Sequence, residues 1–183
     1  MRIAVVGRGN VGGGLADRWE KAGHEVTRIG KEGGDVSGAD AVLFAVPGGA
    51  IADAVANVQG LEGKTVIEAS NRTGETKPPS GFNSNAEFVK SKSNGPTAKS
   101  FNLNFARVYD QVDAAKSKPS HLWTGDEEAR EAVESLSRDA GYEPVYGGPL
   151  ENARVQEDFI QIFFPISQAI GPFLYRMAPP DQL

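Results

Sequence analysis

The sequence of 183 residues contains no cysteine and only two histidines, His24 and His121. Without cysteine the chain has no disulfide, no thiol nucleophile and no cysteine-ligated zinc, and it suits a reducing compartment, so we expect a cytoplasmic protein. Histidine, aspartate and glutamate residues nowhere cluster at the spacing of metal ligands, so we expect no metal site. The sequence also lacks a G-x-S-x-G nucleophile motif and a Walker lysine.

Positive charge and long apolar runs are also scarce. Nineteen lysine and arginine residues stand against 24 aspartate and glutamate residues, for a formal charge of −5. An acidic chain without a basic cluster is a poor partner for nucleic acid or a membrane surface. Polar residues and Pro165 interrupt the apolar stretch after residue 157, whereas a membrane span needs about 20 uninterrupted apolar residues. We therefore expect a small-molecule substrate and neither a nucleic-acid nor a membrane partner.

What the chain does contain is a glycine motif at its amino end. An apolar run over residues 3–6 predicts a buried strand, and a helix-compatible segment ending near Gly23 follows. Between them Gly7, Gly9 and Gly12 have the G-x-G-x-x-G spacing. In this context the first glycine permits a tight turn, the second lets a pyrophosphate approach the backbone, and the third lets the helix pack closely on the strand. The motif predicts a dinucleotide-binding site.

Residues 24–29 alternate as a second strand would, and the charges after it bear on the choice of cofactor. A site for NAD usually carries an acidic residue here, about 20 residues past the glycines, to bind the ribose hydroxyls. This chain has Arg28 and Lys31 instead, and with Arg8 these can neutralise a 2′-phosphate. Glu32 is the one residue that opposes this interpretation. We expect NADP as the cofactor.

Two further apolar segments, 41–46 and 65–69, predict parallel strands whose carboxyl ends lie beside the cofactor. At these ends we expect small apolar residues to line the nicotinamide half of the site: Ala45, Val46, Pro47 and Ala69. Polar and small residues next to them are candidates for binding the substrate: Gly48, Asn71 and Asn102. No residue is an evident catalytic acid or base.

Together these patterns predict an α/β protein with a Rossmann-type, doubly wound, mainly parallel sheet and a small C-terminal helical extension. We expect residues 1–150 to form the dinucleotide-binding domain. Residues 151–183 would be an apolar helical segment, broken at Pro165 and Pro172, that packs on the core or on a second subunit. We also predict a long loop over 74–95, a strand over 97–105, and a helix ending near Ala140.

The scarcity of acid–base groups favours a particular chemistry. Reduction of a carbonyl needs a general acid near the oxygen, whereas hydride exchange between two ring cofactors relies mainly on proximity and stacking. An NADPH-dependent oxidoreductase acting on a flavin-like acceptor is the first interpretation. A reductase of a small carbonyl or imine compound, and an NADP-binding sensor or scaffold module without turnover, are the alternatives.

Several segments resemble one known family. They are GRGNVGGGLA at residues 7–16, KAGHEV at 21–26, AVP at 45–47, KTVIEASN at 64–71, and TGDEEAREAVESLSRDAGYEPVYGGPLENAR at 124–154. In this order they resemble NADPH-dependent reductases of the deazaflavin coenzyme F420, and the related reductase domain of mammalian metalloreductases. The late block is the most distinctive.

The resemblance implies a homodimer in which a deazaflavin lies against the nicotinamide and hydride passes between the rings. It assigns residues to three parts of the cofactor: Gly7, Gly9, Asn10 and Val11 to the pyrophosphate; Gly30 and Lys31, with Arg28 nearby, to the 2′-phosphate; and Ala45, Val46, Pro47 and Ala69 to the nicotinamide.

Overall fold

The computed structural model describes residues 1–74 and 76–182. Residues 75 and 183, which belong to the predicted loop 74–95 and the predicted segment 151–183, lie outside the described residues. Within the described chain a seven-stranded sheet has the order β2-β1-β4-β6-β7-β8-β9. All neighbouring strands are parallel except β7 and β8, which are antiparallel. The strands of this sheet are β1 (Arg2–Val6), β2 (Glu25–Ile29), β4 (Ala41–Phe44), β6 (Thr65–Glu68), β7 (Thr97–Lys99), β8 (Ser120–Gly125) and β9 (Glu143–Tyr146).

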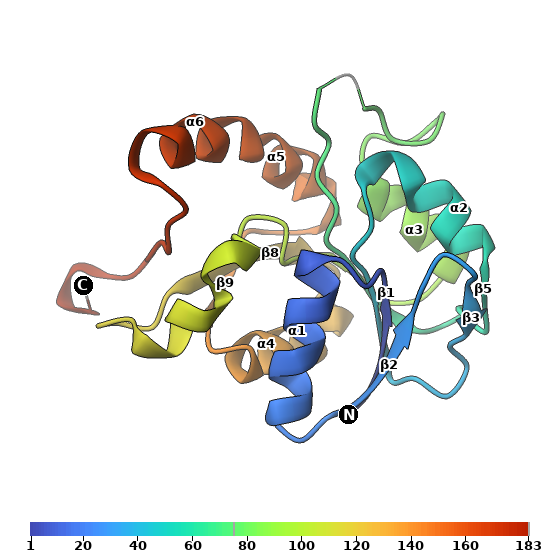
Figure 1. The fold of residues 1–183 in the computed structure, drawn as a ribbon. Coiled ribbons are helices and arrows are strands. Elements are labelled where there is room, and N and C mark those ends of the chain that lie inside the picture. Colours follow the sequence, from blue (N-terminus) through green and yellow to red (C-terminus); the bar gives the residue numbers. More distant parts are fainter. Residues whose placement is uncertain (75, 183) are drawn as a thin grey trace.

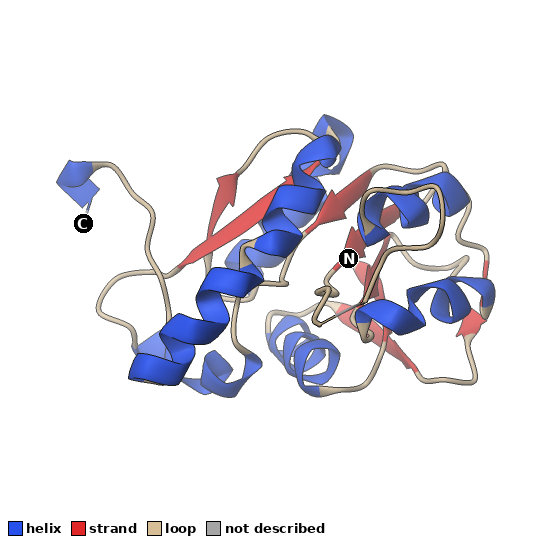
Figure 2. Ribbon diagram, turned by 90° about the horizontal axis from the view of Figure 1, so that it is seen from above, coloured by secondary structure: helices blue, strands red, loops and turns tan. Residues whose placement is uncertain are grey.

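Helices cover both faces of the sheet (Figures 1 and 2). They are α1 (Asn10–Lys21), α2 (Ile51–Ala56), α3 (Asn85–Ser93), α4 (Arg130–Asp139), α5 (Ala153–Asp158) and α6 (Ile160–Ile170). Side chains of β1 alternate between the two faces, as those of a doubly covered strand must. Ile3 and Val5 pack in one core with α1 and α4, whereas Ala4 and Val6 pack in the other with α2 and α3. The doubly wound, mainly parallel sheet predicted from the sequence is confirmed.

The connection after β2 is abbreviated, as the glycine-rich sequence 32–40 indicates. In place of a crossover helix it contains only the short strand β3 (Gly34–Asp35), which pairs with β5 (Val58–Gln59) outside the main sheet. The adenine side of the predicted site is therefore not covered by a helix at this point.

The predicted loop over 74–95 is wrong in its second half, where α3 forms. The Ser84 hydroxyl accepts from the Glu87 backbone N–H at 3.1 Å, and the Glu87 carboxylate accepts from the Asn83 N–H at 2.9 Å. This reciprocal capping starts a helix that the weak apolar periodicity did not reveal.

The predicted strand over 97–105 is also too long, because the extended backbone ends at Lys99. Phe101 adopts a positive φ of 60°, and a 3-10 helix follows over Ala106–Ala114. The positive φ turns the chain out of the sheet. Asn102 therefore lies in a loop at the carboxyl end of β7.

At the C-terminus the predicted break at Pro165 is wrong, because α6 continues through this residue. The chain instead separates α5 from α6 at Phe159. The helix ends at Ile170, just before the predicted second break at Pro172, where Gly171 has a φ of 84°. Ile160 and Phe163 of α6 pack against Leu103. None of the helices in the described part of the chain has the length and apolar character that a membrane crossing requires.

Candidate nucleotide-binding site

The glycine turn brings β1, α1 and β4 closer together than side chains would permit. Gly7 has φ 109°, and a Cβ built on it would lie 2.3 Å from the Ala45 carbonyl oxygen. A Cβ on Gly12 would lie 1.9 Å from the carbonyl oxygen of Gly7. Both glycines are thus required by contacts within the protein.

Gly9 differs from these two. It precedes α1 with ordinary backbone angles of φ −75° and ψ −169°, and a Cβ built on it would meet no atom within 4 Å. The space beside Gly9 is therefore open at the amino end of α1, where the first N–H groups of a helix have no intrahelical partner. The first turn of α1 carries no acidic residue that would repel an anion. This end of the helix suits a phosphate group.

A cavity of about 820 Å³ begins at this turn and follows the carboxyl ends of β1, β2 and β4. Its volume is in the range of pockets that bind cofactors. It is lined by Val6, Gly7, Arg8, Gly9, Gly30, Lys31, Glu32, Ala45, Val46, Pro47, Ala50, Asp53, Ala54 and Asn57. Eight of the thirteen predicted cofactor-binding residues are among them: Gly7, Arg8, Gly9, Gly30, Lys31, Ala45, Val46 and Pro47.

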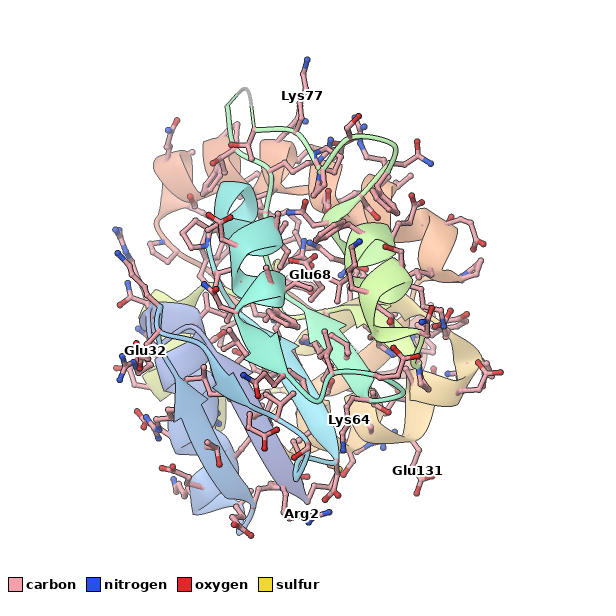
Figure 3. All side chains as sticks on the ribbon, turned by 90° about the vertical axis from the view of Figure 1, so that its right-hand side faces the viewer. Arg2, Glu32, Lys64, Glu68, Lys77 and Glu131 are labelled. Atoms are coloured by element: carbon pink, nitrogen blue, oxygen red, sulfur yellow. The ribbon has the colours of Figure 1, made fainter. Side chains whose placement is uncertain are left out.

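One end of the cavity is charged. The Arg8 guanidinium lies 3.1 Å from the nearer carboxylate oxygen of Glu32, and both side chains are more than half exposed. Lys31 lines the same end. A Cβ on Gly30 would lie 1.9 Å from Arg8 Nη2, so a larger residue here would displace the end of this exposed side chain. Figure 3 shows Glu32 at the periphery of the molecule, in contrast to Glu68 in its interior.

The other end is apolar and small, formed by Ala45, Val46 and Pro47. Beyond Pro47, Gly48 is buried against the loop that follows β6, since its Cβ would lie 2.6 Å from the Asn71 carbonyl oxygen. The Ala69 N–H donates to the Phe44 carbonyl at 2.9 Å, which joins the ends of β4 and β6. A flat ring fits beside such residues, and none of them carries a titratable group.

Five of the predicted cofactor residues do not line the cavity: Asn10, Val11, Gly12, Arg28 and Ala69. Asn10 and Val11 form the first turn of α1, and Gly12 is buried beneath the glycine turn. Arg28 points to α1, where its guanidinium binds Asp17 at 2.8 Å and Glu20 at 2.6 Å. These two acids raise the pKa of Arg28, and both accept from its Nη2.

The predicted substrate residues Asn71 and Asn102 lie together and bind each other. Asn71 Nδ2 donates to the Asn102 carbonyl at 2.7 Å, and Asn102 Nδ2 donates to Asn71 Oδ1 at 2.9 Å. Gln156 of α5 donates to Asn102 Oδ1 at 2.7 Å. The side-chain amide of Asn102 is therefore engaged on both its oxygen and its nitrogen, and 6% of the residue is exposed.

Sequence reasoning missed the part of the site that α2 contributes. Ala50, Asp53, Ala54 and Asn57 line the cavity along one side of this helix. Their spacing of three and four residues, directly after the carboxyl end of a predicted strand, is the signal that would have found them.

The two histidines lie away from the cavity. His24 contacts the chain's amino group through Nδ1 at 3.1 Å and Asp139 through Nε2 at 3.0 Å. His121 is fully buried, and its Nε2 accepts from the Phe101 N–H at 3.2 Å. Burial disfavours the charged ring and lowers the pKa of His121 to about 3, so this ring is neutral.

Comparison with known proteins bears on the fold. No family model and no curated protein matches the chain. Among solved structures it is similar to a candidate F420-dependent NADP reductase from Arthrobacter sp. FB24, with a TM-score of 0.77 and 23% identity over 98% of this chain and 100% of that one. It is also similar to a hypothetical protein from Sinorhizobium meliloti, with a TM-score of 0.67 and 25% identity over 82% and 86%.

A more distant similarity is to a reductive aminase from Aspergillus terreus in complex with NADPH, with a TM-score of 0.66 and 15% identity. The match covers 93% of this chain and 62% of the aminase. These similarities establish the fold. This chain is a Rossmann-like α/β protein.

Proposed function

We propose that this protein is an NADP-dependent oxidoreductase that exchanges hydride with a deazaflavin or flavin-like acceptor. The observation that carries the proposal is the cavity itself, which has an open helix end at Gly9, Arg8 and Lys31 beside Glu32 at one end, and small apolar residues at the other. This order matches the phosphates, the 2′-phosphate ribose and the nicotinamide of NADP. The solved structures of similar fold that are named as NADP or NADPH proteins support the same cofactor.

Different residues of the cavity would bind different parts of NADP. The first turn of α1 would hold the pyrophosphate, and Arg8 and Lys31 would neutralise the 2′-phosphate. The nicotinamide ring would lie against Ala45, Val46 and Pro47, none of which can donate a proton to it. When bound, NADPH supplies the hydride, and these residues contribute orientation and exclusion of water.

A test of cofactor choice uses Arg8 and Lys31, with Arg28 as the matched control. We expect the double variant Arg8→Ala/Lys31→Ala to lose about 1–3 kcal/mol of binding free energy for NADPH and little for NADH, because only NADPH offers the 2′-phosphate. Arg28→Ala should leave both affinities unchanged, since Asp17 and Glu20 already hold that side chain. If Arg28→Ala instead lowers only the NADPH affinity, Arg28 turns to the phosphate on binding. Equal losses for both cofactors in the double variant would contradict the choice of NADP.

Glu32 offers a complementary test. Its carboxylate competes with a 2′-phosphate for Arg8, and it can accept from the 2′-hydroxyl of NADH. Glu32→Gln should therefore raise the ratio of NADPH affinity to NADH affinity, measured by calorimetric titration. A lowered ratio would mean that Glu32 organises Arg8 for the phosphate.

The acceptor is tested by turnover. NADPH is mixed with the protein and, in separate reactions, oxidised F420, FMN, FAD and a panel of carbonyl and imine compounds, while the nicotinamide absorbance is followed. Consumption with F420 or a flavin supports the proposal. Consumption of NADPH with imines alone would favour imine reduction, the alternative suggested by the similar fold of the reductive aminase. Binding of NADPH without consumption with any acceptor would favour a sensor module.

We further propose a homodimer formed through α6. Ile160 and Phe163 face the core, whereas Ile162 and Ile170 are 58% and 71% exposed. Exposed apolar side chains on one helix are typical of a subunit interface. Sedimentation of the wild type and of Ile170→Lys tests this: the variant should sediment as a monomer, and an unchanged sedimentation coefficient would contradict the interface.

A further inference from the structure

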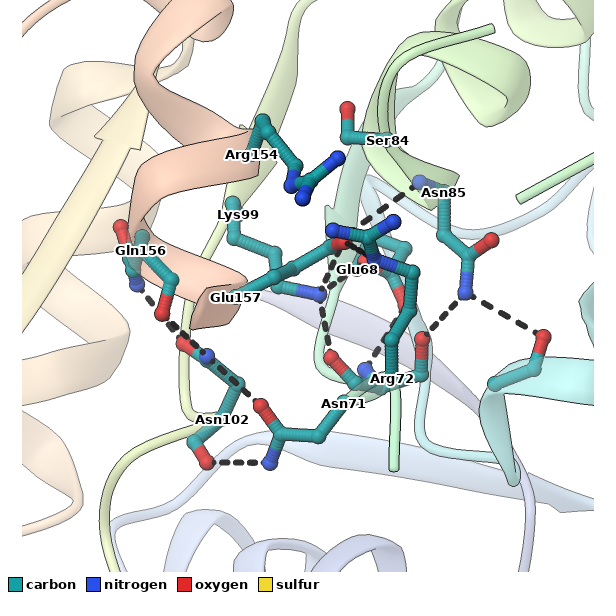
Figure 4. A network of polar contacts seen from close by, with 12 residues as sticks. Glu68, Asn71, Arg72, Ser84, Asn85, Lys99, Asn102, Arg154, Gln156 and Glu157 are labelled. Carbon is teal, nitrogen blue, oxygen red and sulfur yellow. Dashed lines mark hydrogen bonds and ion pairs between the residues drawn. The ribbon is translucent and has the colours of Figure 1, made fainter. Parts of the chain in front are cut away.

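Charged side chains from β6, β7 and α5 and from the loop after β6 meet in one buried group (Figure 4). Its centre is Lys99 at the end of β7, whose side chain is 0% exposed. Lys99 Nζ donates to Glu68 Oε2 at 2.5 Å, to Glu157 Oε1 at 3.1 Å and to the carbonyl oxygen of Ser70. An ammonium group has three N–H donors, so all three are used within the protein.

Glu157 of α5 connects this lysine to a second cation. Arg72 Nε lies 2.7 Å from Glu157 Oε2, and the backbone N–H of Asn85 donates to Glu157 Oε1 at 3.2 Å. Lys99, Arg72, Glu68 and Glu157 thus form a charge-balanced group, which we call the buried ion cluster. Removing four charges from water costs about as much as their mutual attraction returns, so such a cluster adds little to stability. What it does provide is a fixed geometry of the segments that carry it.

The segments fixed in this way are the ends of β4 and β6. The Ser70 N–H donates to Glu68 Oε1 at 2.7 Å, and the carbonyl oxygen of the same residue accepts from Lys99. Asn85 Nδ2 donates both to Ser70 Oγ at 2.8 Å and to the Gly48 carbonyl at 3.2 Å. Ser70 is therefore held by its N–H, its carbonyl and its hydroxyl, and Asn85 links it to the residue that follows Pro47.

We propose that Lys99 and Glu157 are positioning residues for the nicotinamide ring. They lie outside the cavity, and through Ser70 and Asn85 they hold the backbone of 69–71 and of Gly48 in the conformation that receives the ring. This role rests on the proposed function. It predicts that loss of the cluster weakens binding of the nicotinamide half of the cofactor and spares the adenosine half, which binds at Gly9, Arg8 and Lys31.

The test compares two ligands in a charge-balanced variant. Lys99→Met/Glu157→Gln removes one charge of each sign and leaves Glu68 and Arg72, so the buried group stays neutral. Calorimetric titrations are made with NADPH and with adenosine 2′,5′-bisphosphate, which lacks the nicotinamide half. We expect the NADPH affinity to fall about tenfold or more, while the bisphosphate affinity stays within about twofold of the wild-type value.

A control variant and a milder variant complete the design. Arg138→Gln removes an ion pair with Glu134 on α4, neither of which contacts the buried ion cluster, and should change neither affinity. Asn85→Ala cuts the uncharged link between Ser70 and Gly48, and should give the same selective loss even if the double variant does not fold.

The outcomes are distinct. Equal losses for both ligands in the folded variants, or no loss for NADPH, would overturn the positioning role. Failure of the wild type to bind either ligand would instead overturn the proposed function, and the positioning role with it.

Discussion

Gly9 and Gly12 belong to one motif, and the structure predicts opposite consequences of replacing them. At Gly9 a Cβ meets no atom within 4 Å and φ is −75°. Gly9→Val should therefore lower the free energy of unfolding by only about 1 kcal/mol, because valine is a poor N-cap residue for α1. At Gly12 even the Cβ of alanine would lie 1.9 Å from the Gly7 carbonyl oxygen. Gly12→Ala forces the backbone of α1 away from the turn, at a cost of about 1–3 kcal/mol.

The affinity for NADPH should respond differently from stability, with the large loss at Gly9. The valine side chain at position 9 would fill the space in which the pyrophosphate approaches the helix end. Loss of two hydrogen bonds from backbone N–H groups to a charged phosphate costs about 3–6 kcal/mol, which is a loss of affinity of about 100-fold or more. Gly9→Val should therefore be a folded protein that does not bind NADPH at concentrations that saturate the wild type.

Urea unfolding and NADPH titration of the same preparations test this reasoning. A Gly9→Val protein of near wild-type stability and near wild-type affinity would refute the placement of the pyrophosphate. A Gly12→Ala protein as stable as the wild type would refute the close contact between α1 and the glycine turn.

Three predictions concern pH, each measured as the free energy of unfolding. The pKa of His121 is about 3 in the folded protein against an ordinary 6.5, so the unfolded chain binds the proton at a higher pH than the folded protein does. The free energy of unfolding should therefore fall by about 2 kcal/mol from pH 7 to pH 5, and His121→Asn should lack this loss. Burial raises the pKa of Glu157 above 4.5, so stability should fall as pH rises through the raised pKa, and Glu157→Gln should remove that fall; an unchanged profile would contradict the burial. Arg2 holds the pKa of Asp40 at about 2, so the stability from this pair should disappear as pH falls from 3.8 toward 2, but not in Asp40→Asn, whose profile should be flat there.

The sequence was most informative where the structure is local. Gly7 and Gly12 determine the turn, because a side chain on either would clash with a residue close in the chain or in the neighbouring strand, whereas Gly9 faces open space. The apolar runs of β1 and β4 likewise predict a doubly covered parallel sheet, since their side chains leave no polar face.

The sequence does not predict the partner of a charged side chain where that partner depends on how helices and strands pack together. Arg28 is suitably charged for a phosphate, yet the packing of β2 beside α1 gives it Asp17 and Glu20 as partners. Lys99 and Glu157 are 58 positions apart in the chain and each resembles an ordinary surface charge. Only the fold brings them together, which is why the buried ion cluster had no signal beyond a glutamate, Glu68, at the end of an apolar strand.

The most direct measurement is a calorimetric titration of the wild-type protein with NADPH and, separately, with NADH. Our prediction is saturable binding of one NADPH per chain, at least about tenfold tighter than NADH because of the 2′-phosphate. Absence of heat from both cofactors at about millimolar concentration, or tighter binding of NADH, would contradict it.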